Sequence, residues 1–600
     1  MAVDNKGFVL VTTLMMLAVM LALVGTYFTM TRVELAASKA SINSINGFYA
    51  GEAGLNLRAE EVRETFLGYN RPNGNSPSTE LPACEGTNIG SGDFRCKDYT
   101  IGKHKAVTFV TETPGNPRMF SIPPGERYQN LSAQEYRYAA KSVAKNIKND
   151  VEAVLELRFK SRLVPLFQFA VFYDKDLEIL PGATMTLEGP VHTNGDLYLN
   201  TEASLSINGQ VTTAKALYRG RKNSNDCNST QVKIPKNGVF TALFPSCPSR
   251  RKVNKSDVST WNGMIQLEVD PVTVPAPEEF IPQPGATYWD KADLRLVLNL
   301  TGTNAPAIAG ASTTGVSVHN QDTTINNDLT TKLHLCAGTV GGLAANASST
   351  FYSQREKKFL KMLEIDLRAI LNCIQIQQIL GPSKDVGESS EGGLVFYLSV
   401  WGPHSAESSS GYGVRIRNAN PISSTIALAP KPLGLTIISD QSVLTFGHYN
   451  KDNKIPAAIL SDSFNILSSS FDDSKSDKLM SQRPLPVNTT INAALLSGTD
   501  TTGDKEGSSG QGGAYNGGLE NYPRLHENWS AKTLTYYGSF VSLGRPQHAN
   551  GRWLYGEPHY NAPIRDWHYD TMFNDAAKLP PITPRFVYLR QELFVRDYEQ

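Results

Sequence analysis

The chain has 600 residues, with 57 Lys and Arg against 57 Asp and Glu, so its formal net charge is zero. This balance excludes a global electrostatic field that would draw a polyanion to the whole surface. The length predicts roughly two to four domains. The 48 Gly and 34 Pro, together with many Ser, Thr and Asn, favour turn-rich β structure over helix bundles.

The first element is an uncharged, mostly apolar run from Gly7 to Thr31. As a helix, this run is long enough to cross a hydrocarbon core of about 30 Å. A short polar leader that contains Asp4 and Lys6 precedes it. A secretory signal peptide has a shorter apolar core with a small-residue cleavage site after it, whereas the small residue Gly7 comes before this run. Cleavage after Gly7 would therefore keep the apolar helix in the mature protein.

The Gly7-Phe8 junction ahead of this run resembles the class III leader of type IV pilins and type II secretion pseudopilins. The resemblance implies that a prepilin peptidase removes residues 1–7 and that the new N-terminal Phe8 is methylated. It also implies that residues 8–67 form a transmembrane and filament helix. Major subunits of the family carry Glu at the fifth mature position, where this chain has Thr12, so the resemblance implies a minor subunit, including a tip position. A plain N-terminal membrane anchor is the alternative interpretation.

The helical pattern continues without Pro from Val33 to about Leu67, and Gly68 and the turn-rich sequence at 70–74 end it. A helix of about 60 residues extends about 90 Å, so half of it can lie in lipid or a filament core while the rest packs under a globular head. The sequence at 48–55 resembles the N-terminal region of PilX-type minor pilins, in which an aromatic-Ala-x-Glu-Ala-Gly-Leu motif recurs.

Residues 68–165 are predicted to form a pilin-like head, in which an antiparallel sheet covers the second half of the helix. The segment 106–110 is strand-like, and 136–145 and 151–159 are expected to form paired strands, because 151–159 combines β-branched residues with near-alternation in polarity. The last strong β run of the chain, 585–595, has the same character. We expect it to return to the head sheet beside 151–159.

After Pro165 the chain changes to short strands separated by Gly, Asn and Asp, as in 185–199, and the same style returns between 433 and 498. Apolar residues two apart, with polar corners about every six to ten residues, predict a solenoid whose coils stack strand on strand. A sandwich with longer loops is the alternative. We therefore predict a β-solenoid-like insert at residues 166–545.

The predicted fold class is α+β and mostly β: a long N-terminal pilin helix, an antiparallel-sheet head and a large inserted β-solenoid domain. Within the insert, 355–380 is predicted to be an amphipathic helix that ends at Gly381, and 499–518 a long Gly/Ser-rich loop. Residues 546–600 form a C-terminal segment. This plan is similar to that of ComZ-like large minor pilins, in which a β-solenoid is inserted in a pilin head.

The six cysteines occur as three sequential pairs, and their even number and the exported context predict disulfides. Nearest-neighbour pairing is one of about fifteen possible connectivities. The shorter separations favour the first two pairs over the third. The pairs are Cys84 with Cys96, Cys227 with Cys247, and Cys336 with Cys373.

The sequence is poor in recognisable catalytic motifs. It has no phosphate-binding loop, no zinc-binding His pair and no nucleophile elbow, and its closest polar constellation is His192 with Asn194 and Asp196. β-Helical lyases and hydrolases use clustered carboxylates, but turn capping also explains aspartates in such turns. These aspartates are Asp174, Asp176, Asp196, Asp440 and Asp462. We predict that the protein is not an enzyme and has no catalytic residue, metal site or cofactor.

One local charge feature lies between Lys215 and Lys255, where ten basic residues face one acid, Asp226. A disulfide between the second pair of cysteines would fix this segment as a loop. Such a surface could bind DNA phosphates or an anionic cell surface, and a solvated loop is the alternative. Besides Lys215, the basic residues are Arg219, Arg221, Lys222, Lys233, Lys236, Arg250, Arg251, Lys252 and Lys255.

The C-terminal part is rich in aromatic residues between 522 and 569. Exposed aromatic side chains could bind glycans or a surface, whereas packing inside a large domain is the alternative. The residues are Tyr522, Trp529, Tyr536, Tyr537, Trp553, Tyr555, Tyr560, Trp567 and Tyr569.

Together these features predict a minor subunit of a type IV pilus or related filament that displays a large β domain for adhesion or for DNA binding and uptake. The expected location is the inner membrane before assembly, and the pilus, cell surface or periplasm afterwards. Expected partners are other pilins or pseudopilins, the prepilin peptidase, and DNA or surface glycans. The alternatives are a minor pseudopilin of a type II secretion system and a membrane-anchored β-helical carbohydrate-active enzyme, which requires a carboxylate cluster on one solenoid face.

Overall fold

A computed structural model of the chain describes residues 6–67, 72–78, 80–229, 231–272, 274–275, 277–338, 342–499 and 518–597. Apart from its two end residues, the predicted loop at 499–518 lies outside this set. The chain divides into two compact units, which are described separately. Unit 1 comprises Met1–Arg118, Glu135–Arg162 and Leu589–Gln600, and unit 2 comprises Met119–Gln134 and Leu163–Tyr588.

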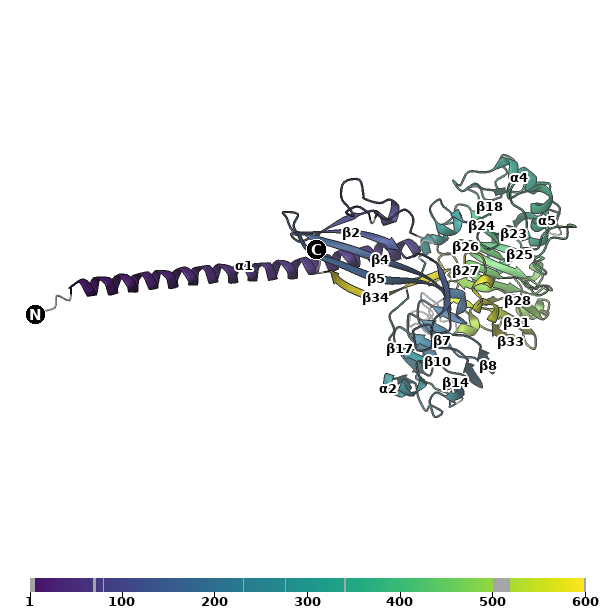
Figure 1. Ribbon diagram of the computed structural model, residues 1–600. Coiled ribbons are helices and arrows are strands. Elements are labelled where there is room, and N and C mark those ends of the chain that lie inside the picture. Colours follow the sequence, from purple (N-terminus) through teal and green to yellow (C-terminus); the bar gives the residue numbers. More distant parts are fainter. Residues whose placement is uncertain are drawn as a thin grey trace, which may run out of the picture. The chain divides into compact units, whose positions relative to one another are not determined.

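The first element of unit 1 is the helix α1, Lys6–Leu67, drawn in purple in Figure 1. Its 62 residues correspond to a length of about 93 Å. Side chains in its first half are exposed, and regularly buried positions begin at Gly47. The long N-terminal apolar helix predicted from the sequence is thus confirmed. It ends at Leu67, directly before the predicted stop at Gly68.

The sheet of unit 1 has the strand order β1-β2-β4-β5-β34, and β3 pairs with β4. β2 and β4 are antiparallel, with Val107 opposite Val143. The last strand of the chain lies next to β5, which contains the segment 151–159 that we expected beside it. The strands are β1 (Lys97–Ile101), β2 (His104–Glu112), β3 (Arg118–Ser121), β4 (Ser132–Lys145), β5 (Val151–Pro165) and β34 (Arg585–Asp597).

Unit 2 begins with coils that stack strand on strand. Val171 pairs with Val191 and Val191 pairs with Val211, all in parallel, so successive coils are 20 residues apart. The chain visits three parallel sheets in turn before it returns to the first. These sheets contain β6 (Val171–Tyr173), β9 (Val191–Thr193) and β12 (Val211–Thr213); β7 (Leu177–Ile179), β10 (Leu197–Leu199) and β13 (Leu217–Arg219); and β8 (Met185–Leu187), β11 (Ser204–Ile207) and β14 (Gln231–Lys236).

The first of these sheets continues through unit 2 in the order β17-β12-β9-β6-β32-β29-β27-β26-β24-β18-β19. All neighbours from β17 to β18 are parallel. Within this sheet, the chain enters in the middle at β6 and adds strands outward to β17. It then enters at the other end with β18 and adds strands inward until β32 lies beside β6. The added strands are β17 (Ile265–Leu267), β18 (Leu294–Asn299), β19 (Val316–Val318), β24 (Leu394–Trp401), β26 (Leu435–Phe446), β27 (Ala457–Leu467), β29 (Ala494–Ser497) and β32 (Phe540–Ser542).

The remaining elements of unit 2 cover or extend this framework, and β28, β31 and β33 form a further parallel sheet. The strands are β15 (Val239–Ala242), β16 (Arg251–Val253), β20 (Ala345–Ser348), β21 (Tyr352–Ser353), β22 (Lys358–Phe359), β23 (Lys361–Asp366), β25 (Tyr412–Arg417), β28 (Thr489–Asn492), β30 (Arg524–Leu525), β31 (Thr533–Gly538) and β33 (Ile564–Tyr569). The helices are α2 (Lys255–Val258), α3 (Thr287–Asp290), α4 (Asn327–His334) and α5 (Leu367–Gln377).

The predicted β-solenoid is present only in part. The body is mostly β and contains several sheets with stacked parallel strands, but the described residues do not form one closed solenoid across 166–545. In a regular solenoid, successive coils have nearly the same length. Here 20 residues separate the starts of β9 and β12, whereas 54 residues separate the starts of β12 and β17 and include the β14–β15 hairpin.

The predicted helix at 355–380 is wrong in its first half, because only α5 is helical. The preceding residues form β23, which pairs with β20 on one side and β25 on the other. Asp366 ends the strand and starts the helix, since its side chain accepts a hydrogen bond from the Ala369 backbone N–H at 3.0 Å. Phe359, which a helix over 355–380 would place on its apolar face, is 51% exposed. Pairing with two neighbouring strands overrides the helical spacing of the apolar residues.

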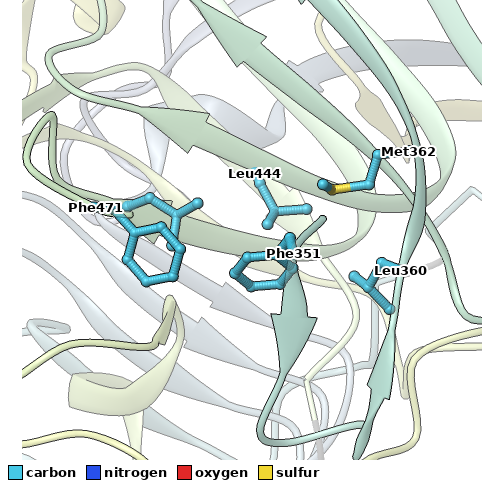
Figure 2. Close-up of a cluster of buried hydrophobic side chains, with 6 residues drawn as sticks. Phe351, Leu360, Met362, Leu444 and Phe471 are labelled. Carbon is cyan, nitrogen blue, oxygen red and sulfur yellow. The ribbon is translucent and has the colours of Figure 1, made fainter. Parts of the chain in front are cut away.

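Part of the core of unit 2 shows what the predicted helix residues do instead. Leu360 and Met362, two residues apart, point into one apolar cluster with residues from β26 and β27 (Figure 2). Residues two apart lie on the same face of a strand, so Leu360 and Met362 reach the same cluster. The buried members of the cluster are Phe351, Leu360, Met362, Leu444, Leu467 and Phe471.

The cysteines pair as nearest neighbours in all three cases, with Cα–Cα distances of 5.7, 5.5 and 5.7 Å. The third disulfide joins Cys336, just after α4, to Cys373 in α5. Of the aromatic residues near the C-terminus, six are buried, whereas Tyr537 and Tyr555 are exposed by 36% and 57%. Packing therefore accounts for most of this aromatic content. The buried residues are Tyr522, Trp529, Tyr536, Tyr560, Trp567 and Tyr569.

Candidate assembly helix and cleft

The first half of α1 is an exposed apolar surface. From Phe8 to Leu35 every large apolar side chain is more than half exposed, and no charged residue occurs before Arg32. By length and composition, this helix is able to cross a membrane. Apolar side chains around the whole circumference need an apolar environment, which lipid or other apolar helices supply.

The polar side chains within this apolar surface satisfy their hydrogen bonds inside the helix. The Thr12 hydroxyl donates to the Phe8 carbonyl at 3.0 Å, and the Thr13 hydroxyl donates to the Val9 carbonyl at 2.9 Å. Neither hydroxyl therefore needs water or a partner from outside the helix. The bond between Gly7 and Phe8 lies in the first turn, because α1 begins at Lys6. Cleavage there, and methylation of Phe8, stay predictions.

The second half of α1 packs closely on the sheet of unit 1 through three glycines. A Cβ atom on Gly47 would lie 2.5 Å from the Glu152 Cβ, and one on Gly54 would lie 2.7 Å from the Ala106 Cβ. At Gly51 it would lie 2.8 Å from a Leu155 methyl group. The glycines of the segment 48–55 therefore allow the helix backbone to approach the strands.

Polar contacts also fix this half of the helix. Arg58 is buried, and its guanidinium donates to the Arg95 carbonyl at 2.8 Å and to Glu61 at 2.6 Å. Arg596, near the end of β34, donates to the Ser44 hydroxyl at 2.5 Å. Among the described residues of unit 1, the first half of the helix is thus exposed and the second half packs on the sheet.

Unit 2 contains a cleft with a volume of about 760 Å³. Its lining includes a row of residues on neighbouring parallel strands, here called the floor, and each of them follows a paired stretch of its strand. Ser439 pairs with Ser461 and Ser461 with Ser497, and Ser542 pairs with Tyr173. The next residue in each strand contributes to the lining of the cleft. These residues are Asp440, Asp462, Gly498, Leu543 and Asp174.

Two carboxylates on adjacent strands form one end of this row. Asp440 accepts hydrogen bonds from the Ser399 hydroxyl at 2.7 Å and the Gln441 amide at 2.9 Å. Asp462 accepts the backbone N–H groups of Gln547 and His548, the latter at 3.1 Å. Burial raises the pKa of both groups, and that of Asp462 to about 6.

The cleft brings together three of the five aspartates singled out in the sequence, Asp174, Asp440 and Asp462. Asp176 and Asp196 are not part of its lining. Sequence reasoning missed the other contributors, which come from loops far away in the chain. They include Phe280, Ile281, Arg545 and His548. Only Phe280 beside Ile281 gives a local signal, and that signal does not distinguish a cleft wall from a core.

The polar constellation around His192 has a structural role. The imidazole is buried and hydrogen-bonds with the Thr212 hydroxyl at 2.7 Å and the Asn194 amide oxygen at 3.1 Å. Asp196 instead accepts the Ala216 backbone N–H at 2.9 Å. Burial lowers the pKa of His192 to about 4, so the ring is neutral at pH 7. These residues link successive coils.

The basic segment at 215–255 contributes fewer surface cations than its sequence suggests. Arg219 is buried, which corrects its assignment to a DNA-binding surface. Its guanidinium donates to the Asn200 side chain at 2.7 Å and to the Asn228 carbonyl at 2.8 Å. Burial lowers the pKa of Arg219 to about 10. The residue therefore satisfies polar groups of the neighbouring coil.

Three further members of this segment form ion pairs. Lys222 lies 2.7 Å from Asp176, Arg251 lies 3.2 Å from Asp257 and Lys255 lies 2.8 Å from Glu268. Lys236 packs over the Trp261 ring, and Arg250 donates to the carbonyls of residues 221 and 222. The other predicted residues are Arg221, Lys233 and Lys252, of which Lys252 is exposed. A role of this segment in binding DNA stays a prediction.

Comparisons with known proteins give a similarity among solved structures. No family model matches the chain, and no curated protein matches it. Among solved structures, the chain is similar to the crystal structure of the competence-associated pilin ComZ from Thermus thermophilus, with 11% sequence identity and a TM-score of 0.26. The similarity covers 92% of this chain and 98% of that chain. A TM-score this low does not establish a shared fold.

Proposed function

We propose that this protein is a minor subunit of a type IV pilus or a related filament. Before assembly, α1 anchors it in the inner membrane. After removal of residues 1–7 by a prepilin peptidase, the first half of α1 packs among the helices of other subunits. The β structure of unit 2 is then displayed outside the membrane, where it serves adhesion or the binding and uptake of DNA.

The observation that supports this proposal is the division of α1 into two halves. The half from Phe8 to Leu35 is apolar and exposed, whereas the half from Gly47 onward packs on the sheet of unit 1. A plain membrane anchor needs only the first half. In this protein the same helix continues into a folded unit. Insertion of its first half in lipid, or packing of that half among other helices, therefore fixes the position of the unit.

Thr12 supports a minor position. Threonine has no carboxylate to pair with the N-terminal amine of a neighbouring subunit, and the Thr12 hydroxyl bonds to the Phe8 carbonyl within its own helix. A subunit without this charge pair depends on apolar packing to join a filament. Such a subunit suits a position that is occupied once, such as the tip, better than a position repeated along the filament.

Mass spectrometry of the mature N-terminus, on protein from sheared surface filaments, tests the proposal. We expect a chain that begins with methylated Phe8. The Gly7→Leu variant should remain uncut in the membrane fraction. Gly25→Leu is the matched control, because a Cβ at Gly25 has nothing within 4 Å, and it should be processed normally. An intact Met1 or Ala2 end in wild-type protein, found only in membranes, would contradict the filament role.

The role in binding DNA has its own test. Neutralisation of Arg250, Arg251 and Lys252 to Gln should weaken the binding of double-stranded DNA and make its affinity less dependent on salt. The control variant neutralises three exposed lysines elsewhere: Lys103, Lys148 and Lys431. Equal loss in both variants would indicate a general effect of charge, and adhesion would then be the remaining role of unit 2.

A membrane-anchored carbohydrate enzyme is the second candidate, because Asp440 and Asp462 lie on adjacent strands in a cleft. Two carboxyl groups close together are the arrangement that glycoside hydrolysis uses. Release of reducing ends from neutral polysaccharides by wild-type protein, and its loss in Asp462→Asn, would favour this candidate. Absence of release from every substrate offered would leave the filament subunit as the better description.

A further inference from the structure

The cleft of unit 2 is elongated along the direction in which the strands stack. Its floor begins at Asp440, continues to Asp462 on the next strand and reaches Asp174 three strands further on. With about 4.8 Å between neighbouring strands, the row from Asp440 to Asp174 spans about 19 Å. A ligand that contacts both ends of the row must be an extended chain.

The chemistry of the walls is mixed. Apolar side chains, among them Phe280, Ile281 and Leu496, line the cleft beside the aspartates. Phe280 is held in place, because its ring packs on Tyr288 at a centroid distance of 4.7 Å and its carbonyl accepts the Tyr397 hydroxyl. Ile281 is 41% exposed. A fixed aromatic ring next to hydrogen-bonding groups suits a ligand with both apolar and polar faces.

The side chains that line the cleft argue against two other ligands, a polyanion and a metal ion. Three aspartates and two permanent cations, Lys175 and Arg545, line the cleft, so it offers no excess of positive charge for a polyanion. Among the described residues, no group of three or more His, Cys, Asp or Glu side chains is placed to hold a metal ion. The carboxylates are therefore available to hydrogen-bond donors of a ligand.

The carboxylates of Asp440 and Asp462 are able to accept further hydrogen bonds. Among the residues that the structure describes, each oxygen of Asp440 and of Asp462 accepts one hydrogen bond. A carboxylate oxygen has two lone pairs, so each of the four oxygens retains one acceptor position. Sugar hydroxyl groups donate such bonds, and the C–H faces of sugar rings pack on aromatic side chains such as Phe280.

We propose that this cleft binds a neutral, hydroxyl-rich chain, namely a polysaccharide of uncharged hexoses, laid along the row from Asp440 to Asp174. The biological context of this inference rests on the proposed function, because the filament would present the cleft to a glycan-covered surface. The binding itself depends only on unit 2. An extended polypeptide is the competing ligand, and the experiment distinguishes the two.

The experiment measures binding of purified full-length protein in detergent to cello-, malto- and galacto-oligosaccharides of graded length by calorimetry. We expect affinity for at least one series to rise with length until the row is filled. Phe280→Ala and Asp440→Asn should each weaken it about tenfold. The matched controls are Phe240→Ala, at an exposed phenylalanine of β15, and Asp452→Asn, at an exposed aspartate, and both should bind like wild type.

Phe280 lies in a wall of the cleft, so the Phe280→Ala variant still tests the inference if the Asp440→Asn variant does not fold. Absence of binding to every neutral series, or binding that Phe280→Ala leaves unchanged, would overturn the inference. Binding of reduced casein, weakened by the same two variants, would assign the cleft to polypeptides instead. The assay contains no filaments, so failure here and failure of N-terminal processing are separate results.

Discussion

Single glycines determine how α1 meets the sheet of unit 1. At Gly54 the nearest atoms to an added methyl group would be the Ala106 Cβ at 2.7 Å and the Ser142 hydroxyl at 3.2 Å. Gly is normally less stable than Ala inside a helix by about 0.5–1 kcal/mol. The close approach must therefore stabilise the unit by more than the helix loses.

We expect Gly54→Ala to lower the free energy of unfolding of unit 1 by about 1–3 kcal/mol, because the added methyl overpacks the helix–sheet contact. Hydrogen exchange of the β2 amides measures this, since Ala106 lies in β2. Gly25→Ala, with nothing within 4 Å, should leave their exchange unchanged. Equal exchange in the Gly54 variant would mean that the helix does not pack this closely.

Buried carboxyl groups make unit 2 sensitive to pH. Burial raises the pKa of Glu520 to about 8 and that of Glu527 to about 7, from 4.5. Between pH 4.5 and the raised pKa of each group, the folded state holds a proton that the unfolded state has lost. The stability of the folded state therefore falls as pH rises through this interval. Burial lowers the pKa values of His192 and His526 to about 4 and 3. These two residues make stability rise with pH, but only below pH 6.5, where the unfolded state binds their protons.

We therefore expect the free energy of unfolding of unit 2 to decrease from pH 6.5 to 8, by about 1.4 kcal/mol per pH unit for each such proton. All six tryptophans belong to unit 2, so their fluorescence in denaturant reports it. Glu520→Gln should flatten the slope, whereas Glu188→Gln, at an exposed site, should not. A slope equal in all three proteins would contradict a protonated Glu520.

At the scale of elements, the boundary between β23 and α5 shows how tertiary contacts select among local preferences. The segment 360–371 has apolar residues at helical spacing, yet β20 and β25 pair with its first half. Asp366 serves both elements. One oxygen caps α5 through the Ala369 N–H, and the other accepts the Asn418 amide at 2.8 Å.

We expect Asp366→Ala to destabilise unit 2 by about 1 kcal/mol through loss of the helix cap. Denaturant unfolding followed by tryptophan fluorescence measures the change. Asp366→Asn is the matched control, because its side-chain oxygen can still cap the helix, and it should restore most of the loss. If the two variants are equally unstable, the carboxylate charge rather than the cap is what α5 needs.

At the scale of the whole unit 2, two runs of the chain that are far apart in sequence close one long sheet. Its outward run starts at β6 and its return run ends at β32, and the two lie side by side. The Ser539 hydroxyl donates to the Phe169 carbonyl at 2.6 Å, and the Phe540 N–H donates to the Ala170 carbonyl at 3.0 Å. The junction is thus hydrogen-bonded like the rest of the sheet.

Hydrogen exchange should reflect this closure. We expect the amides of β6 and β32 to exchange more slowly than those of β17 and β19, because the latter strands end the sheet and have a neighbour on one side only. Mass spectrometry of peptic fragments resolves these segments. Exchange at the β6–β32 junction as fast as at the ends would indicate that the two runs fold as separate bodies.

Elements with a local signal could be predicted from the amino-acid sequence. The apolar run that starts at Phe8 and the absence of Pro up to Leu67 are sufficient for one long helix, and short apolar strands between turns predict a mostly β body. Cysteine order favoured the bonds Cys84–Cys96 and Cys227–Cys247, because short chain separations favour contact, and it left the third pair less favoured although that bond also forms.

The tertiary structure alone decided which strands pair and what their ends form. Asp440 and Asp174 share one row only because β32 returns to β6, and Arg219 is internal only because a neighbouring coil offers it oxygen atoms. The physical reason is the range of the interactions. Periodicity acts between near neighbours in the chain, whereas a cleft depends on strand pairing across hundreds of residues, which leaves no pattern in the sequence of either strand.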